Sequence, residues 1–399
     1  MDIIITPNKL SGNVTAIPSK SHAHRLLICS AFSSEETKII CPQINQDMEA
    51  TADCLRSLGA EITHENGIYH ISPVRNIPKC VTVNCRESGS TLRFLLPVMG
   101  ALGIDTTFAM GGRLPQRPLS PLWEELERMG CHLERPTEDT LRITGKLSAG
   151  EYIIDGGVSS QFITGLLFAM ALMDGKSKLT VTGNLESKPY VDLTCQVLNM
   201  FDINTSDFVV SGPYPFVSPK QITVEGDWSN AAFFYAAAAL GCNVTLSGLD
   251  MRSAQGDREI ITLLRQIQNG TPTICGKDIP DLIPVLAVTA GTFHGAHFTG
   301  ISRLRAKESD RIASVCEMLS NLGVKTQSGP DTLTVYPGTY HSCVIDAFND
   351  HRIAMSAAVA ACVANGVVTI KGANCVEKSY PGFWEEYRRL GGIYEQYLR

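Results

Sequence analysis

The segment 303–311 holds the densest group of charged side chains in the chain. It reads Arg-Leu-Arg-Ala-Lys-Glu-Ser-Asp-Arg, with four cations and two carboxylates in nine residues. If this segment opens the helix that Ile312 continues, Lys307 and Arg311 lie four residues apart on one helical face, with Glu308 beside them. Charged helix starts are usually solvated surface. The segment alone therefore leaves a solvated face and an anion site both open.

Two later groups favour the anion site. Asn349-Asp350-His351-Arg352 stands at the start of an almost wholly apolar helical pattern, and Lys378 follows Cys375-Val376-Glu377. A cation at the mouth of a buried helix needs a partner of opposite charge. We therefore expect Arg352 and Lys378 to have anionic partners.

Three earlier segments place hydroxyl groups or glycine directly before a helical pattern. They are 18–25 (Pro-Ser-Lys-Ser-His-Ala-His-Arg), 87–93 (Glu-Ser-Gly-Ser-Thr-Leu-Arg) and 155–162 (Asp-Gly-Gly-Val-Ser-Ser-Gln-Phe). Backbone N–H groups at a helix start bind phosphate, and glycine lets the backbone approach it closely. Serine at such a position is also an ordinary helix cap. Because the segments occupy comparable positions in successive repeats, we expect them to converge on one cleft.

Arg117 lies in a loop, 111–119, that Pro115 and Pro118 stiffen. A rigid loop can position a guanidinium fork against a phosphate or a carboxylate. A surface arginine without a ligand is the alternative, and the loop alone does not separate the two.

The composition limits the class of protein. The 399 residues have a net charge of −6 and no run of five basic residues, which argues against nucleic acid and favours small anions that fit a pocket. No apolar stretch reaches the roughly 18 residues of a membrane span. The nine histidines form no metal-binding pattern (His22/His24 and His294/His297 come nearest), and no P-loop motif is present. The 13 cysteines include no Cys-x-x-Cys pair, which is typical of a reducing compartment. We expect a cytoplasmic enzyme without a metal or another cofactor.

The elements that position these residues form a repeat. A helical pattern that ends near a glycine or an equivalent residue and runs into a short strand occurs six times, at positions 59, 130, 202, 268, 323 and 391. Glycine after the last helical turn supplies a left-handed cap. Second helical patterns lie at 90–100, 160–172, 229–240 and 350–364. We therefore predict six β-α-β-α-β-type units, three per domain, with helices packed inside sheets and a domain crossing near 215–221.

Nine groups of residues together resemble the family of 3-phosphoshikimate 1-carboxyvinyltransferase (5-enolpyruvylshikimate-3-phosphate synthase), an enolpyruvyl transferase family. They follow the family's order from residue 18 to residue 381: Lys20-Ser21-x-x-x-Arg25, Gly89 with Arg93, Arg117-Pro118, Ser159-Ser160-Gln161, Ser187-Lys188-Pro189-Tyr190, Asp281-Leu282-Ile283-Pro284, Lys307-Glu308-Ser309-Asp310-Arg311, Asn349-Asp350-His351-Arg352 and Lys378.

The resemblance implies a fold of the α/β class, a two-lobed inverse α/β barrel of six βαβαββ repeats, three per domain. It implies an amino-terminal lobe at 19–221, on the 3-phosphoshikimate side. The carboxy-terminal lobe, on the phosphoenolpyruvate side, would combine 1–18 with 222–399. It also implies a monomer with small-molecule substrates.

The implied activity is a transferase of the shikimate pathway, which leads to chorismate and the aromatic amino acids. The enolpyruvyl group of phosphoenolpyruvate moves to the 5-hydroxyl of 3-phosphoshikimate through a tetrahedral intermediate, and phosphate leaves. Both substrates are anions, which suits the cationic and hydroxylic residues above.

The resemblance also implies the role of each residue. The set for 3-phosphoshikimate is Lys20, Ser21, Arg25, Ser159, Ser160, Gln161, Ser187, Asp281 and Lys307. The set for phosphoenolpyruvate is Lys20, Gly89, Arg117, Gln161, Arg311, Arg352 and Lys378. Because the hydroxyl loses a proton while the methylene gains one, the reaction needs a base and an acid. Asp281 (the base) and Glu308 form this pair, and Lys20 is the third catalytic residue.

This chain departs from the family pattern at two places. Many members carry Asn-Ala-Gly-Thr where this chain has Glu87-Ser88-Gly89-Ser90, which puts an extra carboxylate near the enolpyruvate end. Position 303 is arginine where an asparagine commonly contacts the shikimate phosphate, so we assign it no role.

Two other interpretations are compatible with parts of the pattern. A sister enzyme that acts on UDP-N-acetylglucosamine shares the fold and the donor, but it carries a cysteine on a mobile loop, and the loop 111–118 here has none. A non-catalytic anion-binding protein would need the cations but neither Asp281 nor Glu308.

Overall fold

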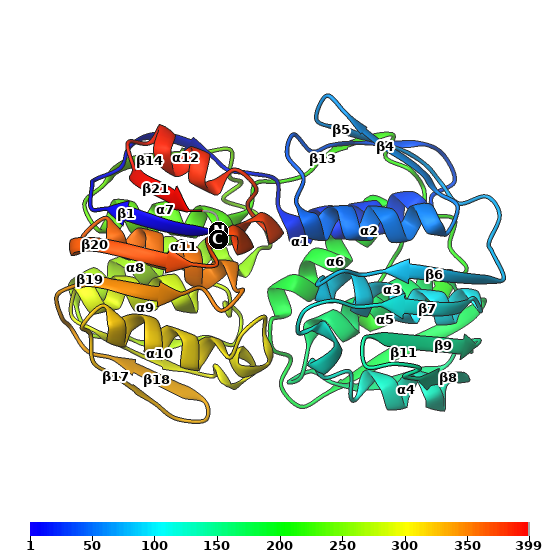
Figure 1. Cartoon of the computed structure of the whole chain (residues 1–399). Helices are drawn as coiled ribbons and strands as arrows, with labels where there is room; N and C mark the ends of the chain where they lie inside the picture. The colour runs from blue at the N-terminus through cyan, green and yellow to red at the C-terminus, as the bar shows by residue number, and fades with distance from the viewer. Residues whose placement is uncertain (398–399) are drawn as a thin grey trace. The chain divides into compact units, whose positions relative to one another are not determined.

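Two units make up the chain in the computed structural model, which describes residues 1–397 (Figure 1). The amino-terminal unit is Pro18–Glu225, and the carboxy-terminal unit combines Met1–Ile17 with the residues from Gly226 to the end of the described chain. Each unit has its own apolar core. No helix within residues 1–397 combines the length and the apolar character needed to cross a membrane.

The chain passes between the units twice, and the two connecting stretches are hydrogen-bonded. The backbone N of Ser19 donates to the carbonyl of Glu225 (2.8 Å), and the backbone N of Asp227 donates to the carbonyl of Ile17 (2.8 Å). The amino-terminal unit is therefore an insertion into the carboxy-terminal unit.

The amino-terminal unit contains three sheets. In spatial order, their strands are β13 (Gln221–Thr223), β3 (Thr37–Ile40), β5 (Ile68–Ser72) and β4 (Glu61–Glu65); β6 (Cys80–Asn84), β7 (Asp105–Ala109), β9 (Thr140–Gly145) and β8 (Cys131–Glu134); and β10 (Glu151–Asp155), β11 (Gly175–Thr182) and β12 (Val209–Gly212).

The carboxy-terminal unit also contains three sheets. Their strands are β19 (His341–Asp346), β20 (Asn365–Lys371), β1 (Asp2–Thr6) and β21 (Ile393–Tyr397); β15 (Thr273–Cys275), β16 (Ala296–Thr299), β18 (Thr332–Val335) and β17 (Thr326–Ser328); and β14 (Asn243–Ser247) with β2 (Ser11–Thr15).

One pattern recurs in these sheets, a parallel pair followed by an antiparallel hairpin. In the sheet β6-β7-β9-β8, β6 and β7 are parallel while β9 is antiparallel to both of its neighbours. The sheet β15-β16-β18-β17 repeats this pairing. The sheet of β10, β11 and β12 has one strand fewer, and β14 with β2 forms only the parallel pair. The predicted α/β fold of six repeats, three per unit, is confirmed.

Two sets of helices accompany the strands. The buried set comprises α1 (Lys20–Ala31), α3 (Gly89–Leu102) and α5 (Ser160–Leu172) in one unit, and α7 (Trp228–Ala239), α9 (Ile283–Thr292) and α11 (His351–Ala361) in the other. The second set comprises α2 (Gln46–Ser57), α4 (Leu122–Arg128), α6 (Lys188–Met200), α8 (Ile260–Asn269), α10 (Arg311–Asn321) and α12 (Phe383–Arg389). Five short 3₁₀ helices are η1 (Leu114–Gln116), η2 (Ser206–Phe208), η3 (Gly256–Glu259), η4 (Ser302–Ala306) and η5 (Ala373–Lys378).

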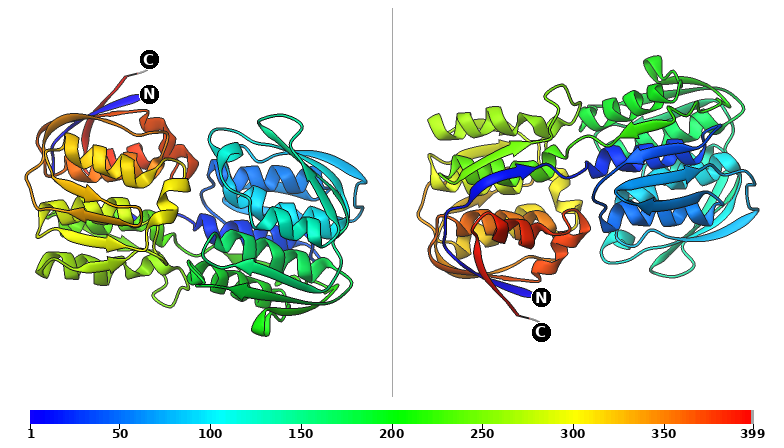
Figure 2. Two further views of the ribbon diagram at one scale, coloured as in Figure 1. Left: turned by 90° about the horizontal axis from the view of Figure 1, so that it is seen from below. Right: turned by 90° about the horizontal axis from the view of Figure 1, so that it is seen from above.

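The buried helices lie against the sheets of their own unit. In the carboxy-terminal unit, α7, α9 and α11 contact one another, and α11 contacts β1 and β20 (Figures 1 and 2). Every residue of α11 is buried. A helix that is apolar on nearly all faces is stable only in such a place.

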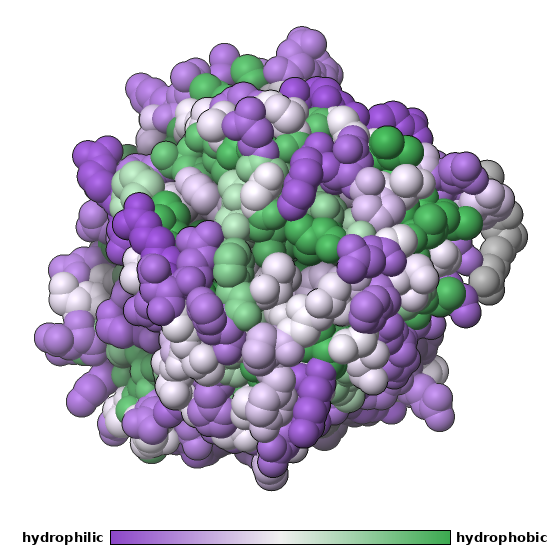
Figure 3. Space-filling model, turned by 90° about the vertical axis from the view of Figure 1, so that its left-hand side faces the viewer, coloured by the Kyte–Doolittle hydropathy of each residue, from purple (hydrophilic) through white to green (hydrophobic). Residues whose placement is uncertain are grey.

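The surface contains both hydrophobic and hydrophilic residues. Figure 3 shows one face on which hydrophobic residues gather near the centre and hydrophilic ones surround them. Exposed apolar side chains are ordinary on a globular protein, so we attach no function to this face.

The predicted left-handed helix ends occur after five of the second-set helices. The residues at 59, 130, 202, 323 and 391 have φ between 60° and 112°. Position 268 is the exception, because it lies inside α8, and Gly270 beyond it is extended, with φ of 171°. The difference accompanies the topology: α8 leads to β15, which pairs in parallel with β16, whereas the strands after the other five helices pair with an antiparallel neighbour.

Candidate functional site

The start of α1 carries the first predicted cluster. The Ser19 side chain caps the helix by accepting from the backbone N of His22. Lys20 follows, and its Nζ lies 2.9 Å from Oδ2 of Asp47 in α2. This helix start therefore has both features considered above: Ser19 is a helix cap, and Lys20 is a cation beside it.

Arg25 is a buried cation that joins three helices. Its Nε donates to the Thr194 hydroxyl of α6 (2.8 Å), and its Nη2 donates to the Tyr190 carbonyl (2.8 Å) and to the Thr164 hydroxyl of α5 (3.4 Å). Nη1 donates to the carbonyl of Ser21, four residues earlier (2.6 Å). Burial lowers the pKa of Arg25 to about 10. These acceptors are neutral, so the guanidinium can attract an anion.

The start of α3 brings two arginines to one glycine. Ser88 caps the helix, and a Cβ added at Gly89 would lie 2.6 Å from Nη1 of both Arg93 and Arg117. Arg93 Nη2 also donates to the Pro118 carbonyl (3.0 Å), which ties the Arg117 loop to α3. Gly89 and Arg117, which the resemblance assigns to phosphoenolpyruvate, therefore lie together, and their role stays a prediction. A side chain at position 89 would displace both guanidinium groups.

Glu87 lies against the same loop. A Cβ built on Gly112 would overlap its carboxyl group. The extra carboxylate noted in the sequence is therefore a neighbour of the loop that carries Arg117.

The starts of α5 and α6 hold the predicted hydroxyl and amide groups. Ser159 caps α5 by accepting from the backbone N of Gln161 (3.3 Å), and Ser160 is buried. The Gln161 amide donates to the Ser90 hydroxyl in α3 (2.9 Å). Ser187 precedes α6 in a left-handed conformation (φ 55°), which is uncommon for a residue other than glycine. Because α5 packs on α6, these groups lie at the starts of two neighbouring helices.

In the carboxy-terminal unit, the Arg311 guanidinium meets three carboxylates. Its Nε lies 2.8 Å from Asp350, its Nη1 2.7 Å from Asp281 and its Nη2 2.6 Å from Glu308. The Arg311 side chain is 1% exposed and that of Asp350 is 0% exposed, so this buried cation is held by charges of opposite sign. Asp350 also caps α11 by accepting from the backbone N of Arg352.

Asp281 joins the two predicted arginines. Its Oδ1 pairs with Arg311, and its Oδ2 lies 3.1 Å from Nη2 of Arg352. Burial raises the pKa of Asp281, but Arg352, Arg311 and Lys307 outweigh that effect and hold it well below its ordinary value. Asp281 is therefore ionised at neutral pH in the free protein, and 25% of its side chain is exposed.

Lys378 is the remaining predicted cation of this unit. It is 9% exposed, and its Nζ donates to the carbonyl of Asn349 (2.8 Å), just before α11. The structure thus places Lys378 near the helix start that carries Arg352.

The prediction of one helical face for Lys307 and Arg311 is wrong. Asp310 caps α10 by accepting from the backbone N of Ala313, so the helix begins only at Arg311. Lys307 has an extended conformation after η4, and Glu308 lies in the turn between η4 and α10. Glu308 reaches Arg311 through this turn.

Asp257 and Ser229 were not anticipated from the sequence. Asp257 is 0% exposed, and its Oδ2 accepts from the Ser229 hydroxyl in the first turn of α7. Burial raises the pKa of Asp257 to about 7, and the negative charge of Asp281 adds to the effect. An acid in the segment Gln255-Gly256-Asp257 looks like an ordinary helix-start carboxylate, so only the tertiary structure reveals it.

We expect Asp257→Asn to change how stability depends on pH. The folded-state pKa of Asp257 is about 7 and its ordinary value is 3.8, so the folded form retains a proton that the unfolded form loses. Stability from this group is therefore present below about pH 4 and is lost as pH rises to about 7. Urea unfolding at several pH values should show the Asp257→Asn variant gaining stability relative to the wild type across this range; a constant difference would contradict the expectation.

No group of three or more His, Cys, Asp or Glu side chains in the described residues could hold a metal ion. His22 and His24 are buried, and each ring Nδ1 is hydrogen-bonded, to the backbone N of Glu225 (3.1 Å) and to the Thr51 hydroxyl (2.7 Å). His297 Nδ1 lies 2.9 Å from the Thr334 hydroxyl. These histidines therefore make protein contacts of their own.

Comparison with known families gives a match over most of the chain. Residues 4–387 match the family model described as EPSP synthase (3-phosphoshikimate 1-carboxyvinyltransferase). A 3-phosphoshikimate 1-carboxyvinyltransferase of Clostridium kluyveri is 37% identical over 420 residues, covering 99% of this chain and 98% of that protein. One of Clostridium perfringens is 38% identical over 420 residues, covering 98% of each chain.

Solved structures share the fold. An EPSP synthase of Acinetobacter baumannii has a TM-score of 0.79 at 24% identity, covering 99% of this chain and 100% of that chain. The enolpyruvyl transferase NikO of Streptomyces tendae has a TM-score of 0.76 at 15% identity, covering 99% of this chain and 98% of that chain.

Proposed function

The chain belongs to the EPSP synthase (3-phosphoshikimate 1-carboxyvinyltransferase) family, and from this premise we propose how its own residues perform the transfer. The enzyme moves the enolpyruvyl group of phosphoenolpyruvate to 3-phosphoshikimate, in the pathway to the aromatic amino acids. The proposal concerns the role of each residue.

The amino-terminal unit supplies most of the binding groups for 3-phosphoshikimate, within the lobe proposed at 19–221. Arg25 is buried among neutral acceptors, so it can bind a negative group of the substrate. Ser159, Ser160 and Ser187 offer hydroxyl groups at the starts of α5 and α6 for the shikimate phosphate. Lys20, Ser21, Gln161, Asp281 and Lys307 complete the set.

Phosphoenolpyruvate is bound by cations from both units. Arg117 and Lys20, with Gly89 and Gln161, belong to the amino-terminal unit, and Arg311, Arg352 and Lys378 belong to the carboxy-terminal unit. Guanidinium forks match phosphate and carboxylate groups in a bidentate way. The expectation that the segments 18–25, 87–93 and 155–162 converge on one cleft remains a prediction.

Asp281 is the proposed base for the acceptor hydroxyl. In the free protein it is held ionised by Arg311 and Arg352, and such a carboxylate is a weak base. When phosphoenolpyruvate engages the same two arginines, its negative charge offsets theirs, which raises the pKa of Asp281 towards the value that proton transfer needs. Binding of the donor thereby activates the base.

Glu308 is the proposed acid for the enol methylene. It lies 2.6 Å from Arg311 and is 23% exposed, so a proton can reach it from solvent. Addition of the hydroxyl gives a tetrahedral intermediate. When phosphate leaves, the methyl group formed in the addition step loses a proton again, and the Glu308 carboxylate takes it. The arginines and lysines stabilise the charge on the departing phosphate.

The observation that carries this proposal is the shared contact of Arg311 and Arg352 with Asp281, in a chain of this family. The test is a phosphate-release assay without added metal, with phosphoenolpyruvate and either 3-phosphoshikimate or UDP-N-acetylglucosamine. We expect phosphate release with phosphoenolpyruvate plus 3-phosphoshikimate, and none with phosphoenolpyruvate plus UDP-N-acetylglucosamine. Release only with the UDP-sugar would identify the sister activity, and release with neither would favour an anion-binding protein.

We expect Gly89→Ala to weaken phosphoenolpyruvate binding without unfolding the protein. The new methyl group would lie 2.6 Å from the ends of Arg93 and Arg117, which are flexible and can move aside. The KM for phosphoenolpyruvate should rise by roughly tenfold, because the displaced guanidinium no longer fits the anion. Gly111→Ala is the matched control, since its nearest neighbour is 3.4 Å away. An equal rise in both variants would remove Gly89 from the site.

We also propose a cytoplasmic monomer that binds neither nucleic acid nor a membrane. The net charge of −6 argues against binding to nucleic acid, and the monomer follows from the family resemblance. Sedimentation at assay concentration tests the oligomeric state.

A further inference from the structure

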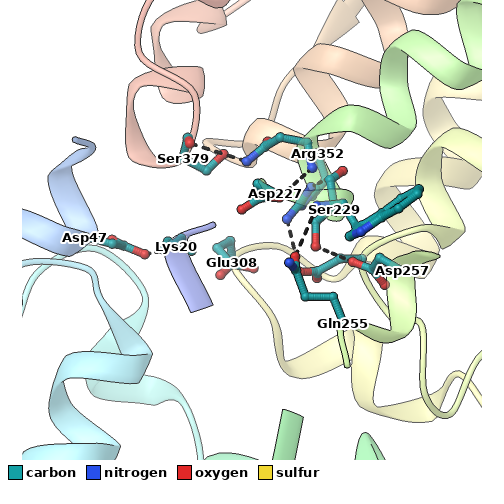
Figure 4. Close-up of polar contacts among 12 residues, drawn as sticks. Lys20, Asp47, Asp227, Ser229, Gln255, Asp257, Glu308, Arg352 and Ser379 are labelled. Atoms are coloured by element: carbon teal, nitrogen blue, oxygen red, sulfur yellow. Dashed lines mark hydrogen bonds and ion pairs between the residues drawn. The ribbon is translucent and has the colours of Figure 1, made fainter. Parts of the chain in front are cut away.

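The first turn of α7 is hydrogen-bonded to the segment 255–257, which has no role in the assigned site. The Gln255 amide oxygen accepts from the backbone N of Trp228 (3.1 Å), and its Nε2 donates to the Gly226 carbonyl (2.8 Å). Two residues later, Asp257 accepts from the Ser229 hydroxyl, as Figure 4 shows. The segment 255–257 therefore makes two hydrogen bonds to this turn and a third to Gly226, just before it.

The same turn orients Arg352. The carbonyl of Ser229 accepts from Arg352 Nη1 (2.9 Å), while Arg352 Nη2 donates to Asp281 (3.1 Å). Arg352 is 2% exposed, and its Nε has no hydrogen-bond partner within the described residues. The guanidinium is thus fixed on one edge by Ser229 and on another by Asp281, with a buried N–H left over.

The depth of Asp257 calls for an explanation. A carboxyl group with no exposed surface destabilises the folded protein unless its contacts compensate. Burial accordingly raises the pKa of Asp257. A hydrogen bond that holds the turn beneath Arg352 gives this carboxyl a function. Arginine has many rotamers, so an anion site gains from contacts that keep the fork in one orientation.

We propose that Asp257 is a positioning residue for phosphoenolpyruvate: through the Ser229 hydroxyl it fixes the carbonyl group that orients the Arg352 guanidinium. This inference rests on the proposed assignment of Arg352 to phosphoenolpyruvate. Asp257 does not touch the substrate.

Steady-state kinetics of Asp257→Ala, Ser229→Ala and the double variant test this role. Each single change should raise the KM for phosphoenolpyruvate by about tenfold, because the guanidinium loses its fixed orientation. The KM for 3-phosphoshikimate should stay within about twofold. The double variant should be no worse than either single one, since both changes break the same link. Asp257→Asn should recover part of the loss, because its amide oxygen still accepts from Ser229.

Thr289→Val is the matched control. It removes a fully buried hydroxyl from α9, whose hydrogen bond to the Val285 carbonyl lies within that helix. The same rise in this variant, or equal rises in the KM of both substrates, would indicate general loosening and overturn the proposal. If Asp257→Ala does not fold, Ser229→Ala and Asp257→Asn provide the same comparison.

Arg352→Ala separates the two levels of the argument. A raised KM for phosphoenolpyruvate in Arg352→Ala, with an unchanged KM in Asp257→Ala, overturns the role of Asp257 alone. An unchanged KM in both overturns the assignment of Arg352 and the role of Asp257 with it.

Discussion

Asp281→Asn is expected to lower kcat by about a thousandfold without weakening the binding of phosphoenolpyruvate. The amide cannot take the proton of the acceptor hydroxyl, so the addition step loses its base. The change also removes the negative charge that pairs with Arg311 and Arg352. Arg352 then loses its paired carboxylate, while Arg311 keeps Asp350 and Glu308 but loses the third, so donor affinity should stay the same or rise. Single-turnover rates and equilibrium binding of phosphoenolpyruvate measure the two effects separately.

This split distinguishes a base from a structural carboxylate. If Asp281 only held the two arginines in place, the variant would lose donor affinity and turnover together. Asp278→Asn removes an exposed carboxylate three residues earlier, and it should leave both quantities unchanged. A kcat for Asp281→Asn within tenfold of the wild type would exclude Asp281 as the base.

Glu308→Gln is expected to lower turnover by about a hundredfold or more while substrate binding is retained. Glutamine has nearly the same shape and can still accept the hydrogen bond from Arg311, 2.6 Å away in the wild type. It cannot deliver a proton to the enol methylene. The kcat with both substrates saturating reports the loss, and the two KM values report binding.

Glu317→Gln gives the matched control for Glu308. Glu317 is an exposed residue of α10, the helix that begins three residues after Glu308, so the same change of charge is made nearby in the chain on the surface of the protein. Full activity is expected for this variant. Unchanged turnover in Glu308→Gln would take Glu308 out of the mechanism.

The repeats could be predicted because each leaves a local signal. Glycine at 59, 130, 323 and 391 follows a helix and adopts positive φ, and backbone conformations of this kind are read from residue type alone. The failure at 268 arose from the pairing of distant strands: β15, the strand after α8, pairs in parallel with β16, and nothing near α8 in the sequence records that. Local patterns report local geometry, and topology is the sum of long-range contacts.

The same division applies to the candidate site. The arginines and carboxylates of the carboxy-terminal unit could be identified from residue type and motif. The partners of Arg311 could not, because Asp281 and Asp350 come from segments 30 and 39 residues away. Ser229 and Asp257 carry no pattern that separates them from ordinary residues of a helix start. Only their distance in the folded chain gives them a role.

The insertion of one unit into the other sets an order of events during synthesis. Strand β1 pairs Ile3 with Ile370 and with Gln396, so a ribosome must add more than 360 further residues before these partners exist. At about 5–20 residues per second, this takes roughly 20–70 s. The inserted unit, whose chain ends at Pro18 and Glu225 come together, is complete long before then. The apolar strand β1 therefore has no sheet partners during most of translation. The amino-terminal unit, which is synthesised after β1, can fold before β1 pairs.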